Sequence, residues 1–178
     1  MQNPESISYP YLLQKAWPII LANAAVPLLG LVDTAVIGNV GTVEDLGAIA
    51  FGGLIFSFVY WSFGFLRMGT TGFVARAMGA GDDVEVRAVL GRALLLALSL
   101  GVMLIALQWL IRLAAFSLLD GSEAAMSLAA SYAHIRIFSA PAVLANYAIL
   151  GWFIGQQKTR ITLAMLLLTN GVNIVLDL

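Results

Sequence analysis

The sequence predicts an all-α, polytopic membrane protein. Of its 178 residues, 61% are hydrophobic and only 11% are charged, whereas soluble domains carry about 25% charged residues. The mean hydropathy is +0.93, and the apolar residues form long segments separated by short polar breaks. Because unpaired backbone groups are costly in lipid, we expect these segments to cross the bilayer as helices.

Five segments are long enough to span a membrane. The first is too long for the core of a signal peptide, so we expect it to be retained as a transmembrane helix. The last reaches the end of the chain without a helix-ending signal, and we therefore expect residues 1–178 to form one lobe that continues in a longer protein. The predicted helices cover residues 16–38, 46–75, 89–112, 127–156 and 161–178.

The distribution of Lys and Arg predicts the orientation in the membrane, since cytoplasmic segments are enriched in both. One set of helix ends carries Lys15, Arg76, Arg87, Arg92, Lys158 and Arg160, and the other carries Arg112 and Arg136. The first set includes the N-terminal flank. We therefore expect a multi-pass protein of the cell inner (plasma) membrane with a cytoplasmic N-terminus.

Asp33 is the only charged residue between residues 16 and 38. A carboxylate within a membrane costs roughly 2.5 to 3.5 kcal/mol on insertion scales, so it usually marks a functional site. Asp33 lies about 26 Å above the inner end of its helix and Asp177 about 24 Å above the inner end of the last one. Asn170, Asn173 and Asp177 follow i, i+3, i+7 spacing and share one helix face. We expect this face to point inward, toward Asp33.

Two further stripes are candidates to line the same cavity. Seven-residue spacing places Tyr132, Ser139 and Asn146 on one face of the fourth predicted helix. Small and aromatic residues follow one face of the second predicted helix from Gly53 to Gly72. The candidate lining residues are Tyr60, Trp61, Met68, Ser139 and Asn170. The glycines of these helices, including Gly151 and Gly155, are also typical of close helix packing.

Structural interpretations of the charged and polar residues stay open. Asp33 could form an ion pair with Arg136, whereas Arg67 lies at a poorly matching depth. Asn173 and Asp177 could instead supply hydrogen bonds between helices. Pro18 and Pro27 interrupt the first predicted helix and allow it to bend.

Several classes of chemistry are excluded by what the sequence lacks. It has no Cys and one His, so thiolate and His-rich metal sites are excluded. No phosphate-binding G-x-x-x-x-G-K-[ST] loop and no hydrolase motif are present. With a net charge of -1, nothing indicates nucleic-acid binding. We expect no enzyme activity and no cofactor, and we expect any transport to be driven by an ion gradient.

An acid in a low-dielectric site binds a proton readily, because burial disfavours its charged form. The ionised acid attracts lipophilic cations, and nearby aromatic rings add cation–π contacts. Proton and cation then compete for one site. This competition predicts antiport of a lipophilic cation against protons.

Four motifs resemble one transporter family. PLLGLVDTAVIG (27–38), LRMGTTGFVARAMGAGD (66–82), IRIFSAPAVLANYAILGW (135–152) and NGVNIVLD (170–177) are similar to the N-terminal half of multidrug and toxic compound extrusion (MATE) transporters, especially the DinF-like branch. The resemblance implies twelve helices in two six-helix lobes, of which this chain holds five. It also implies export of cationic or amphipathic drugs in exchange for protons or sodium.

The same resemblance implies roles for individual residues. Asp33, Asn146, Asn173 and Asp177 match the cation site of the N-terminal lobe, and a sodium ion would bind at Asp33, Asn173 and Asp177. Pro18 matches the proline associated with bending of the first helix. The partners implied are the lipid bilayer, the drugs and the C-terminal lobe. Arg76 replaces a Gln that is frequent in the family.

Three other functions compete with multidrug export. A flippase for lipid-linked saccharides shares the general architecture, but its cavity should be more basic to hold phosphate. An intramembrane aspartyl protease needs two acids at one level, yet Asp177 follows Ile-Val-Leu instead of Gly-x-Gly. A membrane assembly subunit without transport activity is the third possibility.

Overall fold

Every regular element in the described part of the chain is a helix, which confirms the predicted fold class. The computed structural model describes residues 41–117 and 122–177 and the single positions 9, 13, 16, 17, 20 and 38; the side chains of residues 44 and 173–177 are not described. The elements are α2 (Val43–Ser62), α3 (Phe65–Gly79), α4 (Asp83–Ala106), α5 (Gln108–Phe116), α6 (Glu123–Arg136), the 3-10 turn η1 (Ile137–Ser139), α7 (Ala140–Gly155) and α8 (Thr159–Asp177).

The helices begin at capping residues that precede the apolar segments. Thr42 and Asp45 form a capping box at the start of α2, and Asp82 and Ser122 cap α4 and α6 by accepting hydrogen bonds from backbone N–H groups two or three residues into each helix. Such caps satisfy N–H groups that have no partner within the helix. The helices therefore start several residues before the predicted spans.

The turn between α3 and α4 depends on Gly81. Its φ of 70° lies in the left-handed region, which costs a side chain about 1 to 2 kcal/mol. The N–H of Gly81 donates to the carbonyl of Met78 and that of Asp82 to the carbonyl of Ala77, the hydrogen-bond pattern of a Schellman motif. This motif lets α4 return antiparallel beside α3.

Each of the three long helical stretches is interrupted once. The α2–α3 stretch breaks at Phe63 and Gly64, whose N–H groups donate to carbonyls three residues back. Leu107 separates α4 from α5. The α6–α7 stretch, predicted as one helix, tightens into η1 before Pro141, which stands in the first turn of α7. Proline lacks an N–H, so a regular α-helical hydrogen-bond ladder cannot run through this point.

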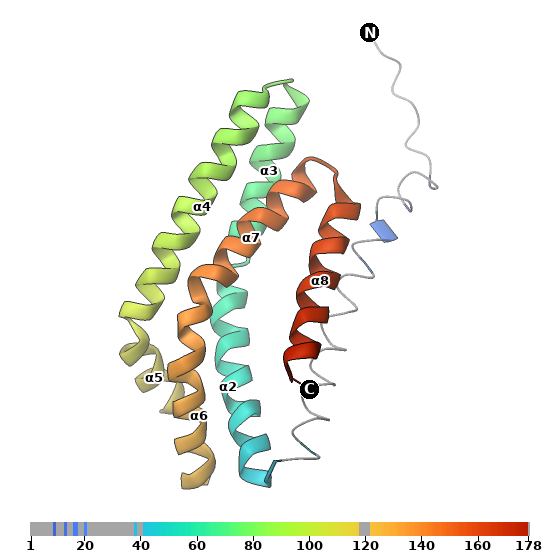
Figure 1. The fold of residues 1–178 in the computed structure, drawn as a ribbon. Coiled ribbons are helices and arrows are strands. Elements are labelled where there is room, and N and C mark those ends of the chain that lie inside the picture. The colour runs from blue at the N-terminus through green and yellow to red at the C-terminus, as the bar shows by residue number, and fades with distance from the viewer. Residues whose placement is uncertain are drawn as a thin grey trace.

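Helix α7 is the centre of the bundle. It packs against α3 and α4, and α8 returns antiparallel beside it, while α2 packs against α6 (Figure 1). The main core contains Phe56, Leu66, Ala97, Leu144 and Ala148. Gly101 of α4 lies directly against Pro141, so that no side chain fits between them.

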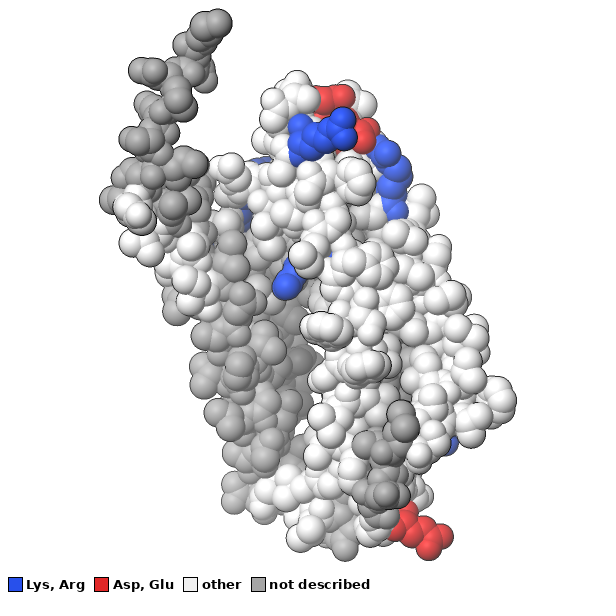
Figure 2. All heavy atoms as spheres, turned by 180° about the vertical axis from the view of Figure 1, so that it is seen from behind, with Lys and Arg blue, Asp and Glu red and all other residues white. Residues whose placement is uncertain are grey.

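The described helices have the length and surface of membrane spans. Asp45–Gly79, Asp83–Ala106 and Glu123–Gly155 are long and apolar enough to cross a bilayer, and Thr159–Val172 is a shorter apolar helix. Their surface is apolar, with Phe58, Trp61 and Leu168 at least 70% exposed. On the face shown in Figure 2, most charged side chains gather at the end that carries the α3–α4 turn. The chain is thus a multi-pass membrane protein, and the first predicted span, 16–38, lies almost entirely outside the described residues.

Candidate functional site

The predicted polar face of α8 is directed inward at Asn170. This side chain is half-buried between exposed neighbours, Thr169 and Gly171. Its Nδ2 atom is fully buried and has no hydrogen-bond partner among the described residues. A buried donor left unpaired costs about 1 to 3 kcal/mol, which favours a site that receives water or a ligand.

The other two residues of this face continue the same helix. Asn173 and Asp177 lie within α8, three and seven residues beyond Asn170, and so share its face. Their side chains lie outside the described part of the structure. Asp177 stands 18 residues from the start of α8 at Thr159, which places it about 27 Å along the helix.

Asn146 lies on α7 at the level of Asn170. It is half-buried and lies nine residues before the end of α7 at Gly155, or about 14 Å from that end, while Asn170 lies about 17 Å from the start of α8. The two helices are packed antiparallel neighbours. Two amide side chains therefore stand at one depth, below the level of Asp177.

The structure brings two predicted lining residues, Tyr60 and Ser139, into contact. Their hydroxyl oxygens lie 3.3 Å apart, and the Ser139 hydroxyl also donates to the carbonyl of Arg136 over 2.8 Å. With its only hydrogen used there, Ser139 accepts the bond from Tyr60. Because the Tyr60 ring is 8% exposed within the main core, this pair joins the end of α2 to η1.

Trp61 and Met68, two other predicted lining residues, lie on an open face. They are 78% and 75% exposed and stand seven residues apart on the α2–α3 stretch. A side chain added at Gly53 or Gly72 of the same stripe would meet no atom within 4 Å. In the described part of the structure, these glycines therefore do not serve helix packing, and a role of this face in a cavity stays a prediction.

Gly151 and Gly155 are packing residues, as the structural interpretation of these two positions predicted. A Cβ atom at Gly151 would lie 2.5 Å from the carbonyl oxygen of Arg67, and one at Gly155 would lie 2.7 Å from the Cβ of Val74. The hydroxyl of Thr71 donates to the Arg67 carbonyl over 2.8 Å and also lies 3.2 Å from the Gly151 carbonyl. These contacts hold α3 against α7.

Arg136 is held by aromatic side chains. Its guanidinium lies 5.6 Å from the ring centroid of Phe56 and 5.3 Å from that of Tyr132, and it donates a hydrogen bond to the Tyr132 hydroxyl. Among the described residues it forms no ion pair, and neither does Arg67. Asp33, Pro18 and Pro27 lie outside the described residues, so the proposed Asp33–Arg136 pair stays a prediction.

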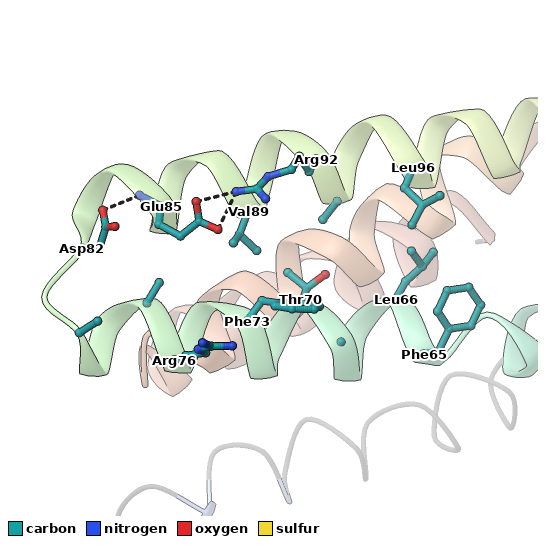
Figure 3. Close-up of a pocket in the computed structure, with 14 residues that line it drawn as sticks. Phe65, Leu66, Thr70, Phe73, Arg76, Asp82, Glu85, Val89, Arg92 and Leu96 are labelled. Atoms are coloured by element: carbon teal, nitrogen blue, oxygen red, sulfur yellow. Dashed lines mark hydrogen bonds and ion pairs between the residues drawn. The ribbon is translucent and has the colours of Figure 1, made fainter.

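One hollow was not predicted from the sequence. It lies between α3 and α4, near an ion pair in which Arg92 contacts both carboxylate oxygens of Glu85 at 2.6 Å (Figure 3). The pair follows i, i+7 spacing on α4, which is a possible sequence signal. The facing residues of α3 are brought there only by the register of the two antiparallel helices.

Comparison with known proteins places the chain in a family. The MatE family model matches residues 18–178. DNA damage-inducible protein F of Escherichia coli (strain K12) is 44% identical over 162 residues, which cover 91% of this chain and 35% of that protein. Multidrug resistance protein NorM of Vibrio cholerae serotype O1 is 29% identical over 154 residues, which cover 84% of this chain and 32% of that protein. The chain thus spans about a third of the length of these relatives.

Solved structures share the fold. A MOP superfamily transporter from Pyrococcus furiosus superposes with a TM-score of 0.83 and 25% identity over 93% of this chain and 36% of that one. A MATE protein in complex with Br-NRF gives a TM-score of 0.75 at 24% identity, over 93% of this chain and 37% of that one, and shows the fold alone. With the family model matched over residues 18–178, the chain belongs to the MatE family.

Proposed function

We propose that residues 1–178 form five helices of the N-terminal lobe of a secondary active multidrug efflux antiporter. The observation that carries the proposal is the inward face of α8, which presents a buried, unpaired amide at Asn170 in line with Asn173 and Asp177. The names of the relatives, multidrug resistance protein NorM above all, support drug export. We expect neither enzyme activity nor a cofactor.

The mechanism we propose is exchange at one acidic site. Asp33 and Asp177 bind protons in one state and attract a cationic or amphipathic compound when ionised. Asn173 and Asn146 supply polar contacts near and below the acids. A proton is the expected coupling ion; a sodium ion would bind at Asp33, Asn173 and Asp177. Because a low-dielectric surrounding strengthens both interactions, occupation by one cation excludes the other.

Exchange across the membrane needs the complete protein. We expect a second lobe of six helices, against which this lobe moves to expose the site alternately to the two sides. The α3–α4 and α7–α8 turns lie at the same end of the bundle (Figure 1), and that end carries Arg76, Arg87 and Lys158. We place this end and the N-terminus in the cytoplasm, with the protein in the inner (plasma) membrane.

A lipid-linked saccharide flippase is the alternative transport function. Its cavity must hold a phosphate, which calls for arginine or lysine beside the substrate. Among the described residues of α7 and α8, two amides, Asn146 and Asn170, are half-buried and two hydroxyls, of Thr159 and Thr162, are buried, whereas Arg160 is exposed. This polarity favours a cation site.

The decisive experiment is the substitution Asp33→Asn in the complete transporter, with counterflow of a fluorescent cation measured in vesicles. Asn keeps the shape of the side chain but cannot ionise, so the exchange stops while the protein stays folded. Asp83→Asn, an exposed acid at the α3–α4 end, is the matched control and should export normally. Retained export together with lowered thermal stability would show that Asp33 is a structural counter-charge to Arg136, and the mechanism would be wrong.

A further inference from the structure

A groove with two chemically different ends runs between α3 and α4. It encloses a volume of about 590 Å³, within the range of roughly 300 to 1,000 Å³ found for ligand pockets. Figure 3 shows Glu85, Val89 and Leu96 pointing from α4 toward α3. The end near the turn is lined by Arg76, Asp82, Glu85 and Arg92, and the far end by Phe65 and Leu96.

The groove runs along the membrane normal. Its walls are antiparallel helices, one of which, α4, is long enough to cross the bilayer. Asp82 and Leu96 are 14 residues apart, or about 21 Å. Phe65, Phe73 and Leu96 are 54%, 65% and 48% exposed, so the apolar part lies open at the depth of lipid acyl chains. Its shape fits a long apolar chain whose polar end lies beside the turn.

The charges at the polar end are balanced. Arg92 and Glu85 form an ion pair with 64% and 43% of their side chains exposed, and Asp82 accepts a hydrogen bond from the Glu85 N–H over 2.9 Å. Arg76, in the last turn of α3, has no ion pair with any described residue. Two guanidinium groups and two carboxylates thus surround one opening.

This balance selects among lipid headgroups. A net-anionic headgroup would meet two carboxylates, and a net-cationic one would meet two arginines. A headgroup that carries both a phosphate and a primary ammonium satisfies both signs, because Arg binds phosphate oxygens and carboxylates accept N–H bonds from an ammonium. A trimethylated ammonium has no N–H to donate.

We propose that the α3–α4 groove binds one phospholipid with a zwitterionic phosphate and primary-ammonium headgroup, as in phosphatidylethanolamine. The phosphate binds Arg76 and Arg92, the ammonium binds Asp82 and Glu85, and an acyl chain lies along Phe65 and Leu96. The lipid comes from the leaflet on the side of the α3–α4 turn. The proposal rests on residues of α3 and α4 and does not depend on the acids of the proposed exchange site.

Filling the groove tests the acyl-chain part of the proposal. A Cβ atom at Gly69, which lines the groove, or at Gly72, which does not, would meet no atom within 4 Å. Gly69→Leu therefore occupies the groove, and Gly72→Leu is the matched control on the same helix. In native mass spectrometry of the delipidated, complete transporter, we expect wild type and Gly72→Leu to rebind one phosphatidylethanolamine. Binding to Gly69→Leu should weaken by at least about tenfold.

Substitutions at the polar end test the headgroup, and they leave the groove open. Arg76→Gln removes a charge, and Asp82→Asn removes a charge but keeps a good helix cap. Each should weaken phosphatidylethanolamine binding about tenfold, whereas Arg87→Gln, on α4 but outside the groove, should not. Wild type should bind phosphatidylethanolamine more tightly than phosphatidylcholine or phosphatidylglycerol. Equal binding of the three lipids, lipid binding unaffected by Gly69→Leu, or no binding to wild type would overturn the proposal.

Discussion

Replacing Gly151 with alanine should separate α3 from α7. The new Cβ atom would lie 2.5 Å from the Arg67 carbonyl oxygen and 3.0 Å from the Cβ of Thr70. Contacts this short require the α3 backbone to move, and overpacking of this kind costs about 1 to 3 kcal/mol. The movement also lengthens the 3.2 Å contact between the Thr71 hydroxyl and the Gly151 carbonyl, a minor loss because the hydroxyl keeps its 2.8 Å bond to the Arg67 carbonyl.

Alanine has a higher helix propensity than glycine by about 1 kcal/mol, and this gain opposes the stability lost through overpacking. A second glycine-to-alanine variant without a clash is therefore needed for comparison. Gly91→Ala lies inside α4, where an added Cβ atom meets nothing within 4 Å, so it receives the same gain without the clash. The stability difference between the two variants should therefore be about 1 to 3 kcal/mol.

Thermal unfolding of the complete transporter in detergent provides the measurement. We expect Gly151→Ala to lower the Tm and Gly91→Ala to leave it unchanged or raise it. Equal Tm values for the two variants would refute the close contact between α3 and α7. Both variants should reach the membrane in similar amounts, which checks that insertion is unaffected.

Three further outcomes are expected in the complete transporter. Among single-cysteine variants in cells, Asp83→Cys should resist an impermeant thiol reagent while Ser122→Cys reacts; the opposite labelling would reverse the orientation. Gly81→Ala should lower the free energy of unfolding by about 1 kcal/mol, because alanine avoids the left-handed region; an unchanged Tm would contradict this. Trp152→Phe should lower the free energy of unfolding by about 1 kcal/mol, because it removes the 2.9 Å bond from the indole N–H to the Val86 carbonyl. An unchanged or raised Tm would count against this role.

Hydropathy predicted the membrane spans but not where their helices begin and where they break. It marks apolar residues only, so it missed the polar first turn of α4, where Asp82 caps the helix. It also joined α2 with α3, α4 with α5 and α6 with α7 into single helices, although Pro141 supported a break before α7. Such breaks depend on local hydrogen bonds that a hydropathy average does not register.

For the candidate site, helical periodicity predicts which residues share a helix face but not which helices come into contact. The i, i+3, i+7 spacing predicts that Asn170, Asn173 and Asp177 share one helix face; Asn170 is half-buried, and the inward direction of the other two stays a prediction. The contact between Tyr60 and Ser139 was not predictable, since it joins residues 79 positions apart. The α3–α4 groove likewise requires the relative register of two helices.

The interruptions at Phe63 and at Ile137 are the points at which the α2–α3 and α6–α7 stretches can bend. Stretches of 35 and 33 residues would each act as one rigid lever if they were continuous. Where the regular hydrogen-bond ladder is interrupted, resistance to bending falls. Close glycine contacts hold α3 against α7, so we expect bending at the interruptions to shift α2 and α6 and to leave the α3–α7 contact in place.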